Sequence, residues 1–185
     1  NVSHCDPIGF PLHVTQVLGE SNPVSEQALI RFLMEKGVEF TPGTQYAYSN
    51  IGYLTLGLAL EEVSGLSYED YVKTHVLHPL GLYDMHIGKN LLADKREREG
   101  EYAGNGYVAP SIYGTGVNVP WEYGGWNLEA MDAHGGWIAT ARDLVRLLVA
   151  VDGFSTKPDI LSAASIQTMT TASAVNGGYS LGWSV

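Results

Sequence analysis

Residues 40–53 read FTPGTQYAYSNIGY, and this stretch decides the fold. It begins with a Thr-Pro-Gly-Thr turn, because Pro fixes its own φ and Gly is free to take a positive φ. Ser49 or Asn50 can then cap a helix that runs to about Ser64. Tyr48 is therefore expected directly before the first turn of that helix.

The helix over residues 50–64 is apolar on nearly every side. A helix of this composition is normally buried on most sides, so we expect it to be buried. Gly52 and Gly57 each cost an exposed helix about 1 kcal/mol against Ala. That cost is tolerable where another element must approach the helix closely.

Flanking segments predict further helices. Apolar residues three and four apart follow a Ser or Thr cap at four places, and they predict helices beginning near Ser25, Ser67, Thr140 and Ser162. This pattern indicates a mainly α fold, which we expect to form one domain over residues 1–185.

Two segments do not fit helices. Residues 100–127 hold many glycines and aromatic side chains, which is too irregular for a helix and too aromatic for a flexible linker. We expect a long ordered loop there, and such loops usually serve a function. Residues 179–185 alternate like the beginning of a strand, which predicts one short strand at the C-terminus.

Composition excludes several classes of function. Ten Lys and Arg face twenty Asp and Glu, a formal charge of -10, so we expect no binding to nucleic acid, which favours basic surfaces. No apolar run is long enough for a membrane span. Cys5 is the single cysteine, and His4, Cys5, Asp6 and His13 fit no standard zinc spacing. We therefore expect neither a metal site nor a cofactor.

One apparent catalytic motif is misleading. Residues 178–182 read GYSLG and match the G-x-S-x-G elbow of α/β-hydrolases around Ser180. That elbow requires a following helix and later acid and His partners, and only three residues follow Gly182. We therefore reject an esterase of that class.

A series of motifs over about residues 25–185 resembles the serine β-lactamase-like superfamily, which includes class C β-lactamases, D-Ala-D-Ala carboxypeptidases and related esterases. The order of the motifs is more specific than any one of them. The matching stretches are Phe40–Tyr53, Val63–Val72, His78–Leu82, Ala133–Leu144 and Tyr179–Trp183.

The resemblance implies roles for two residues of the Tyr-x-Asn motif. Tyr48 would be the acid and base for a nucleophilic serine and its leaving group, and Asn50 would hydrogen-bond the substrate amide or a motif lysine. The chain contains neither the Ser-x-x-Lys nor the Lys-Thr-Gly motif of that family. We therefore interpret it as the central helical piece of a larger two-domain serine hydrolase, without the half that holds the nucleophile.

Physical chemistry predicts that this piece is inactive alone. A tyrosine ordinarily has a pKa of about 10, and lowering it to about 7 requires about 4 kcal/mol. A helix N-terminus supplies about 0.3 to 1 kcal/mol, and about 2 at most. The remainder must come from cations, which the family's two motif lysines would provide.

Further residues are candidates to line a substrate cleft. His134 stands before two glycines that let the backbone approach a ligand, and the aromatic loop lies upstream. The candidate lining residues are His134, Gly135, Gly136, Trp137, Tyr113 and Trp121. An alternative function is a non-catalytic module that binds cell-wall sugars or peptides with these residues, although the loop aromatics could equally pack on one another.

Partners and location follow less directly. The parent enzyme would act on a small molecule or peptide: a β-lactam, a D-Ala-D-Ala peptide and a simple ester all suit the motif. Apolar segments around Phe10 and Leu12 and around Leu181 and Trp183 would lack their partners, so we expect self-association. The single cysteine and the cell-wall relatives favour export to the periplasm or beyond.

Overall fold

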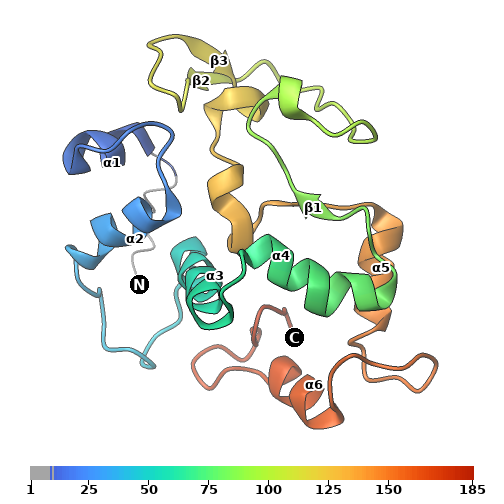
Figure 1. The fold of residues 1–185 in the computed structure, drawn as a ribbon. Helices are drawn as coiled ribbons and strands as arrows, with labels where there is room; N and C mark the ends of the chain where they lie inside the picture. Colours follow the sequence, from blue (N-terminus) through green and yellow to red (C-terminus); the bar gives the residue numbers. More distant parts are fainter. Residues whose placement is uncertain (1–8, 10) are drawn as a thin grey trace.

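The computed structural model describes residue 9 and residues 11–185, and capped helices dominate it (Figure 1). Ser25 begins the second helix by accepting a hydrogen bond from the amide of Ala28, and Thr140 forms a reciprocal capping box with Asp143. The main helices are α1 (Pro11–Leu18), α2 (Glu26–Met34), α3 (Asn50–Ser64), α4 (Tyr68–Val72), α5 (Ala141–Val149) and α6 (Ala163–Thr170).

Shorter elements connect these helices. Two π-helical turns are η2 (Lys73–Leu77) and η5 (Trp121–Gly125), and three 3-10 turns are η3 (His78–Leu80), η4 (Leu92–Asp94) and η6 (Glu129–His134). The short strands are β1 (His86–Ile87), β2 (Val108–Pro110), β3 (Asn118–Pro120) and β4 (Trp137–Ile138). β1 pairs with β4 and β2 with β3, both antiparallel.

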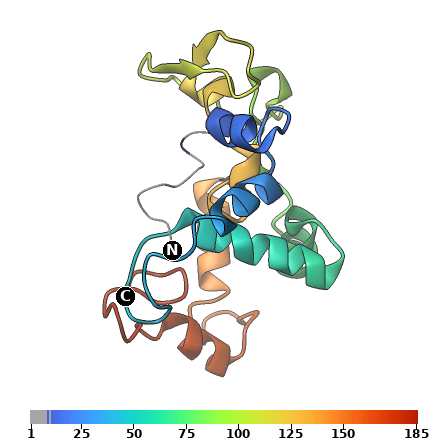
Figure 2. The same cartoon turned by 90° about the vertical axis from the view of Figure 1, so that its left-hand side faces the viewer.

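Helix α3 lies in the middle of the molecule (Figures 1 and 2). In the two perpendicular views of Figures 1 and 2, the β2–β3 segment lies at one end and α6 at the other, with α3 between them. α2 packs on α3 through the main core. That core holds Val14, Val24, Ala28, Leu29, Phe32, Leu33, Leu54 and Ala130. A second cluster, Leu77, Leu82 and Met85, packs against partly buried side chains that include Val76 of η2 and Leu80 of η3.

The prediction that α3 is buried on most sides is wrong. Only Leu54 and Gly57 of this helix are buried, whereas Leu56 is 64% and Val63 is 87% exposed. Among the described residues, α2, α4 and η6 pack against the helix. The close approach expected at Gly57 is present, because a Cβ added there would lie 2.6 Å from the Cβ of Ala133.

The loop over residues 100–127 is ordered and packs on itself. Its middle is the β2–β3 hairpin, in which Ala109 faces Val119. The ring of Trp121 lies 5.5 Å from Tyr107 and 4.7 Å from Trp126, measured between ring centroids. These ring contacts are those that the self-packing interpretation of the loop aromatics expects.

The C-terminus forms a tight turn in place of the predicted strand. Tyr179 and Ser184 make one isolated bridge, and the amide of Ser180 donates to the carbonyl of Trp183 at 2.9 Å. Gly182 takes a φ of +84°, which reverses the chain and prevents extended pairing.

Some predictions fall outside the part of the chain that the structure describes. The His4, Cys5 and Asp6 stretch and Phe10 lie outside the described residues. Within the described residues, no helix combines the length and apolarity that crossing a bilayer requires. No group of three His, Cys, Asp or Glu side chains gathers there as a metal would require.

Candidate active site

Tyr48 lies at the N-terminus of α3, directly before the N-cap residue Ser49. Ser49, the cap, is extended, and its Oγ accepts a hydrogen bond of 3.1 Å from the amide of Gly52. The cap fixes the direction in which the chain enters the helix and so fixes Tyr48. The side chain of Tyr48 is not sealed in the core, because the residue is 65% exposed.

Tyr48 lines a surface hollow of about 370 Å³. Three other tyrosines, Tyr46, Tyr53 and Tyr179, share the hollow with it. The ring of Tyr179 lies 5.4 Å from that of Tyr46, so the C-terminal turn forms one wall. The remaining lining residues are Ala47, Ser49, Gly52 and Leu56.

Tyr53 is held in its neutral form. Burial raises its pKa to about 12, and a hydrogen bond with Tyr179 and the nearby phenols of Tyr46 and Tyr48 act in the same direction. A hydroxyl with this pKa stays protonated at neutral pH. At neutral pH Tyr53 therefore lines the hollow as a neutral phenol that can form hydrogen bonds, and it does not act as a base.

Asn50 lies two positions after Tyr48 as the first residue of α3, and it is half-buried. The two residues are thus held at the same helix end, as the spacing predicts. The hollow is lined by residues on the outer side of this end, and Asn50 is not one of them.

The residues around His134 lie beside the middle of α3 and not beside its N-terminus. Ala133, directly before His134, contacts α3 at Gly57. Trp137 begins β4, and its Nε1 donates to the hydroxyl of Tyr68 at 3.3 Å. His134, Gly135, Gly136 and Trp137 are absent from the lining of the Tyr48 hollow.

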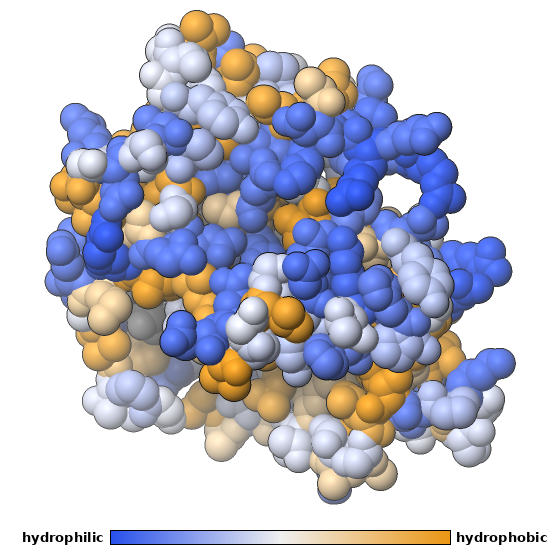
Figure 3. Space-filling view, in the orientation of Figure 1, coloured by the Kyte–Doolittle hydropathy of each residue, from blue (hydrophilic) through white to orange (hydrophobic). Residues whose placement is uncertain are grey.

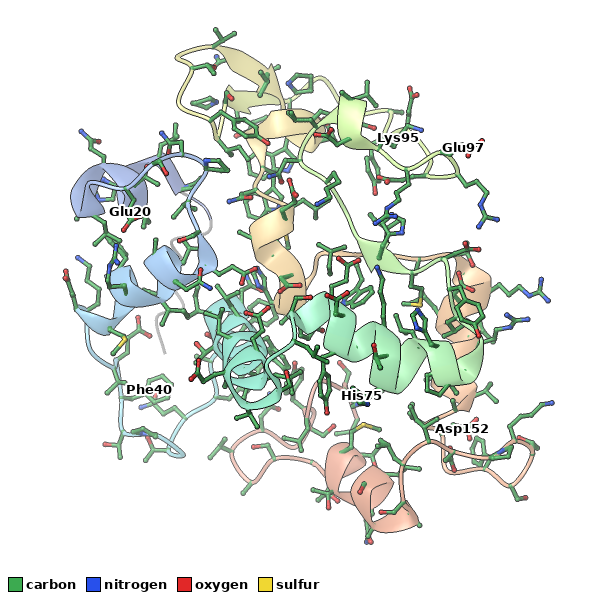
Figure 4. All side chains as sticks on the ribbon, in the orientation of Figure 1. Glu20, Phe40, His75, Lys95, Glu97 and Asp152 are labelled. Atoms are coloured by element: carbon green, nitrogen blue, oxygen red, sulfur yellow. The ribbon has the colours of Figure 1, made fainter. Side chains whose placement is uncertain are left out.

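The loop residues Tyr113 and Trp121 lie at the other end of the molecule. The amide of Tyr113 donates to Ser111 Oγ at 3.3 Å within the loop, and Trp121 is held in the stack with Tyr107 and Trp126. Neither lines the hollow. In Figure 4 the labelled Lys95 and Glu97 mark the loop before this segment, remote from α3.

Sequence reasoning missed three tyrosines of the hollow as candidates. Tyr46 and Tyr53 lie at positions −2 and +5 from Tyr48, so a count of tyrosines around the motif could have found them. Tyr179 lies 131 residues further along the chain, and no local signal assigns it. Ser180, the rejected nucleophile, is buried, and its hydroxyl donates to Trp183 O at 3.3 Å.

Comparison with known proteins identifies the family. The family model described as Beta-lactamase matches residues 8–185. The chain belongs to the β-lactamase family. Among curated members, it is 28% identical to penicillin-binding protein 4* of Bacillus subtilis, over 85% of this chain and 35% of that protein. It is 23% identical to a putative D-alanyl-D-alanine carboxypeptidase of Escherichia coli O157:H7, over 80% of this chain and 36% of that protein.

Solved structures of the β-lactamase fold agree. A D-stereospecific amidohydrolase from Streptomyces sp. superposes with a TM-score of 0.62 at 21% identity, over 84% of this chain and 42% of its own. A D-amino acid amidase from Ochrobactrum anthropi superposes with a TM-score of 0.57 at 24% sequence identity. The match covers 81% of this chain and 40% of that one. At this identity the likeness establishes the fold. The chain spans about a third of the length of the curated relatives it matches.

Proposed function

We propose that this chain is the part of a β-lactamase-family serine hydrolase that supplies its acid and base, Tyr48. The observation that carries the proposal is the exposed phenol fixed at the capped mouth of α3, inside a hollow large enough for part of a small substrate. Relatives named as a penicillin-binding protein, carboxypeptidase and amidase support hydrolysis of an amide or related acyl bond.

The reaction is acyl transfer through a covalent intermediate. The phenolate of Tyr48 takes the proton of a serine hydroxyl as that oxygen attacks the substrate carbonyl. The resulting phenol returns the proton to the leaving nitrogen or oxygen as the acyl bond breaks. Asn50, at the same helix end, hydrogen-bonds the substrate amide or a lysine of the nucleophile motif.

The serine and the cations that activate Tyr48 come from outside these 185 residues. The chain holds no Ser-x-x-Lys, and no Lys, Arg or His among the residues that the structure describes lines the hollow. We therefore expect the 185-residue chain alone to leave nitrocefin and p-nitrophenyl acetate at their background rates. Turnover by the pure chain that disappears in Tyr48→Phe would contradict this expectation.

The decisive test uses a protein that carries this chain together with a Ser-x-x-Lys motif. There Tyr48→Phe is expected to lower kcat/KM about 100-fold or more, the usual contribution of a positioned acid and base. Tyr83→Phe is the matched control, because Tyr83 is 71% exposed and does not line the hollow. Equal activity of both variants would refute the role of Tyr48.

A further inference from the structure

Within the part of the chain that the structure describes, the lining of the Tyr48 hollow carries no charge. The described lining residues are four tyrosines, Ala47, Ser49, Gly52 and Leu56. The electrostatic influences on the pKa of Tyr53 that come from described residues are those of Tyr46, Tyr48 and Tyr179. These residues offer phenol rings, an aliphatic side chain and hydroxyls to a group that enters the hollow.

The aromatic walls are fixed before any ligand arrives. The hydrogen bond between Tyr53 and Tyr179 joins α3 to the C-terminal turn, and the ring of Tyr46 packs against Tyr179. A Cβ added at Gly182 would lie 3.5 Å from the Tyr53 hydroxyl, so the turn approaches this wall closely. Rings held in place lose little entropy when a second aromatic group packs on them.

From these observations we infer that the hollow is a subsite for an uncharged aromatic group of the substrate, so that the preferred substrates are amides and esters that carry an aryl or arylalkyl group. The inference rests on the proposed function, because it assigns the substrate class of the same site. A carboxylate placed among the described lining residues would lose hydration without gaining a cation from them.

Binding to the 185-residue chain tests the inference without catalysis. The ligands are 2-phenylacetamide and phenylacetate, which share shape and differ in charge. We expect saturable amide shifts at Tyr46, Tyr53 and Tyr179 in NMR titrations with phenylacetamide, and binding of phenylacetate weaker by about tenfold. Equal or tighter binding of phenylacetate, or shifts confined to other parts of the chain, would overturn the inference.

Variants distinguish the aromatic subsite from the acid and base role of Tyr48. Tyr179→Leu is expected to weaken the binding of phenylacetamide about fivefold or more, because it removes an aromatic ring from the lining of the hollow. Tyr46→Leu provides a second variant of this kind should the first unfold. Tyr83→Leu, outside the hollow, is the matched control. Tyr48→Phe keeps its ring and should therefore weaken the binding of phenylacetamide less than the wall variants do, even where it lowers hydrolysis by the larger protein. Normal binding by both folded wall variants would overturn the subsite, and full hydrolysis by Tyr48→Phe would overturn only the proposed function.

Discussion

The side chains of Asn90 and Asn127 are joined by a buried hydrogen bond of 3.1 Å across 37 residues of chain. Asn127 also donates to the carbonyl of Val24 at 2.9 Å, and Asn90 Oδ1 accepts from the amide of Glu129 at 3.1 Å. The pair therefore ties the segment before α2 to the segments before η4 and η6, and through them to the flank of α3.

Removing Asn127 should destabilise the fold. Asn127→Ala leaves the Val24 carbonyl and the Asn90 amide buried without this partner, and we expect a loss of about 3 kcal/mol in the free energy of unfolding. Urea denaturation measures it. Asn118→Ala, on the exposed side of β3, is the control and should change stability by about 0.5 kcal/mol or less. Similar losses in the free energy of unfolding of both variants would contradict the stabilising role of the Asn90–Asn127 hydrogen bonds.

The two glycines of α3 should respond in opposite directions. Ala is the better helix former at both positions. At Gly57 the new methyl would meet Ala133 Cβ at 2.6 Å, whereas at Gly52 the nearest atoms belong to Ser49 at 3.6 Å. We expect Gly57→Ala to destabilise by about 1 to 3 kcal/mol and Gly52→Ala to be neutral or slightly stabilising. Thermal unfolding of both variants makes the comparison.

These contacts show how far the sequence could predict the molecule. Caps such as Ser25 and Ser49 act within one turn, so their helices were predictable, and Gly57 indicated a close neighbour. Burial of α3 was not predictable, because it depends on which elements are present to cover an apolar face. The hollow was only half predictable: Tyr48 is set by a local turn and cap, but its wall at Tyr179 comes from a distant segment.

Stability should fall as pH rises from 5 to 8.5. Burial, together with the charges of Asp132 and Glu61, raises the pKa of Glu26 to about 8. Burial and the charges of Glu61 and Glu69 raise that of Asp132 to about 7, and a hydrogen bond joins Glu26 to Asp132. The folded chain thus keeps protons that the unfolded chain releases from about pH 4 upward. Deprotonation therefore favours unfolding as pH rises through the two folded pKa values.

Replacing the Glu26 carboxyl with a neutral amide should remove part of the pH dependence of stability. Glu26→Gln keeps a donor towards Asp132 and cannot ionise, so its urea midpoint should exceed that of the unmodified chain at pH 8.5 and approach it at pH 5. Glu62→Gln, exposed on α3, is the control and should follow the unmodified chain. A parallel pH profile for Glu26→Gln would show that the pair does not titrate in this range.

Exposed apolar side chains should cause self-association. Leu144, Val145 and Leu148 of α5 are each about half exposed, and Leu181 of the C-terminal turn is 65% exposed. Apolar patches reach the surface over the lower half of the molecule in Figure 3. We expect light scattering to give a mass that rises with concentration, and Leu144→Gln with Leu148→Gln to reduce it. A constant monomer mass at high concentration would contradict this prediction.

The contacts of the His86 ring assign its tautomer. Nδ1 lies 2.9 Å from the carbonyl of Asp84, which can only accept, so this ring nitrogen carries a hydrogen. Nε2 lies 3.6 Å from Glu99 Oε2, and both side chains are nearly buried.

Nitrogen chemical shifts of the neutral ring should therefore show the Nδ1–H tautomer of His86, because the carbonyl of Asp84 can only accept a hydrogen bond. His75→Gln, at an exposed histidine, should leave the His86 shifts unchanged, whereas an Nε2–H tautomer in the unmodified chain would contradict the assignment.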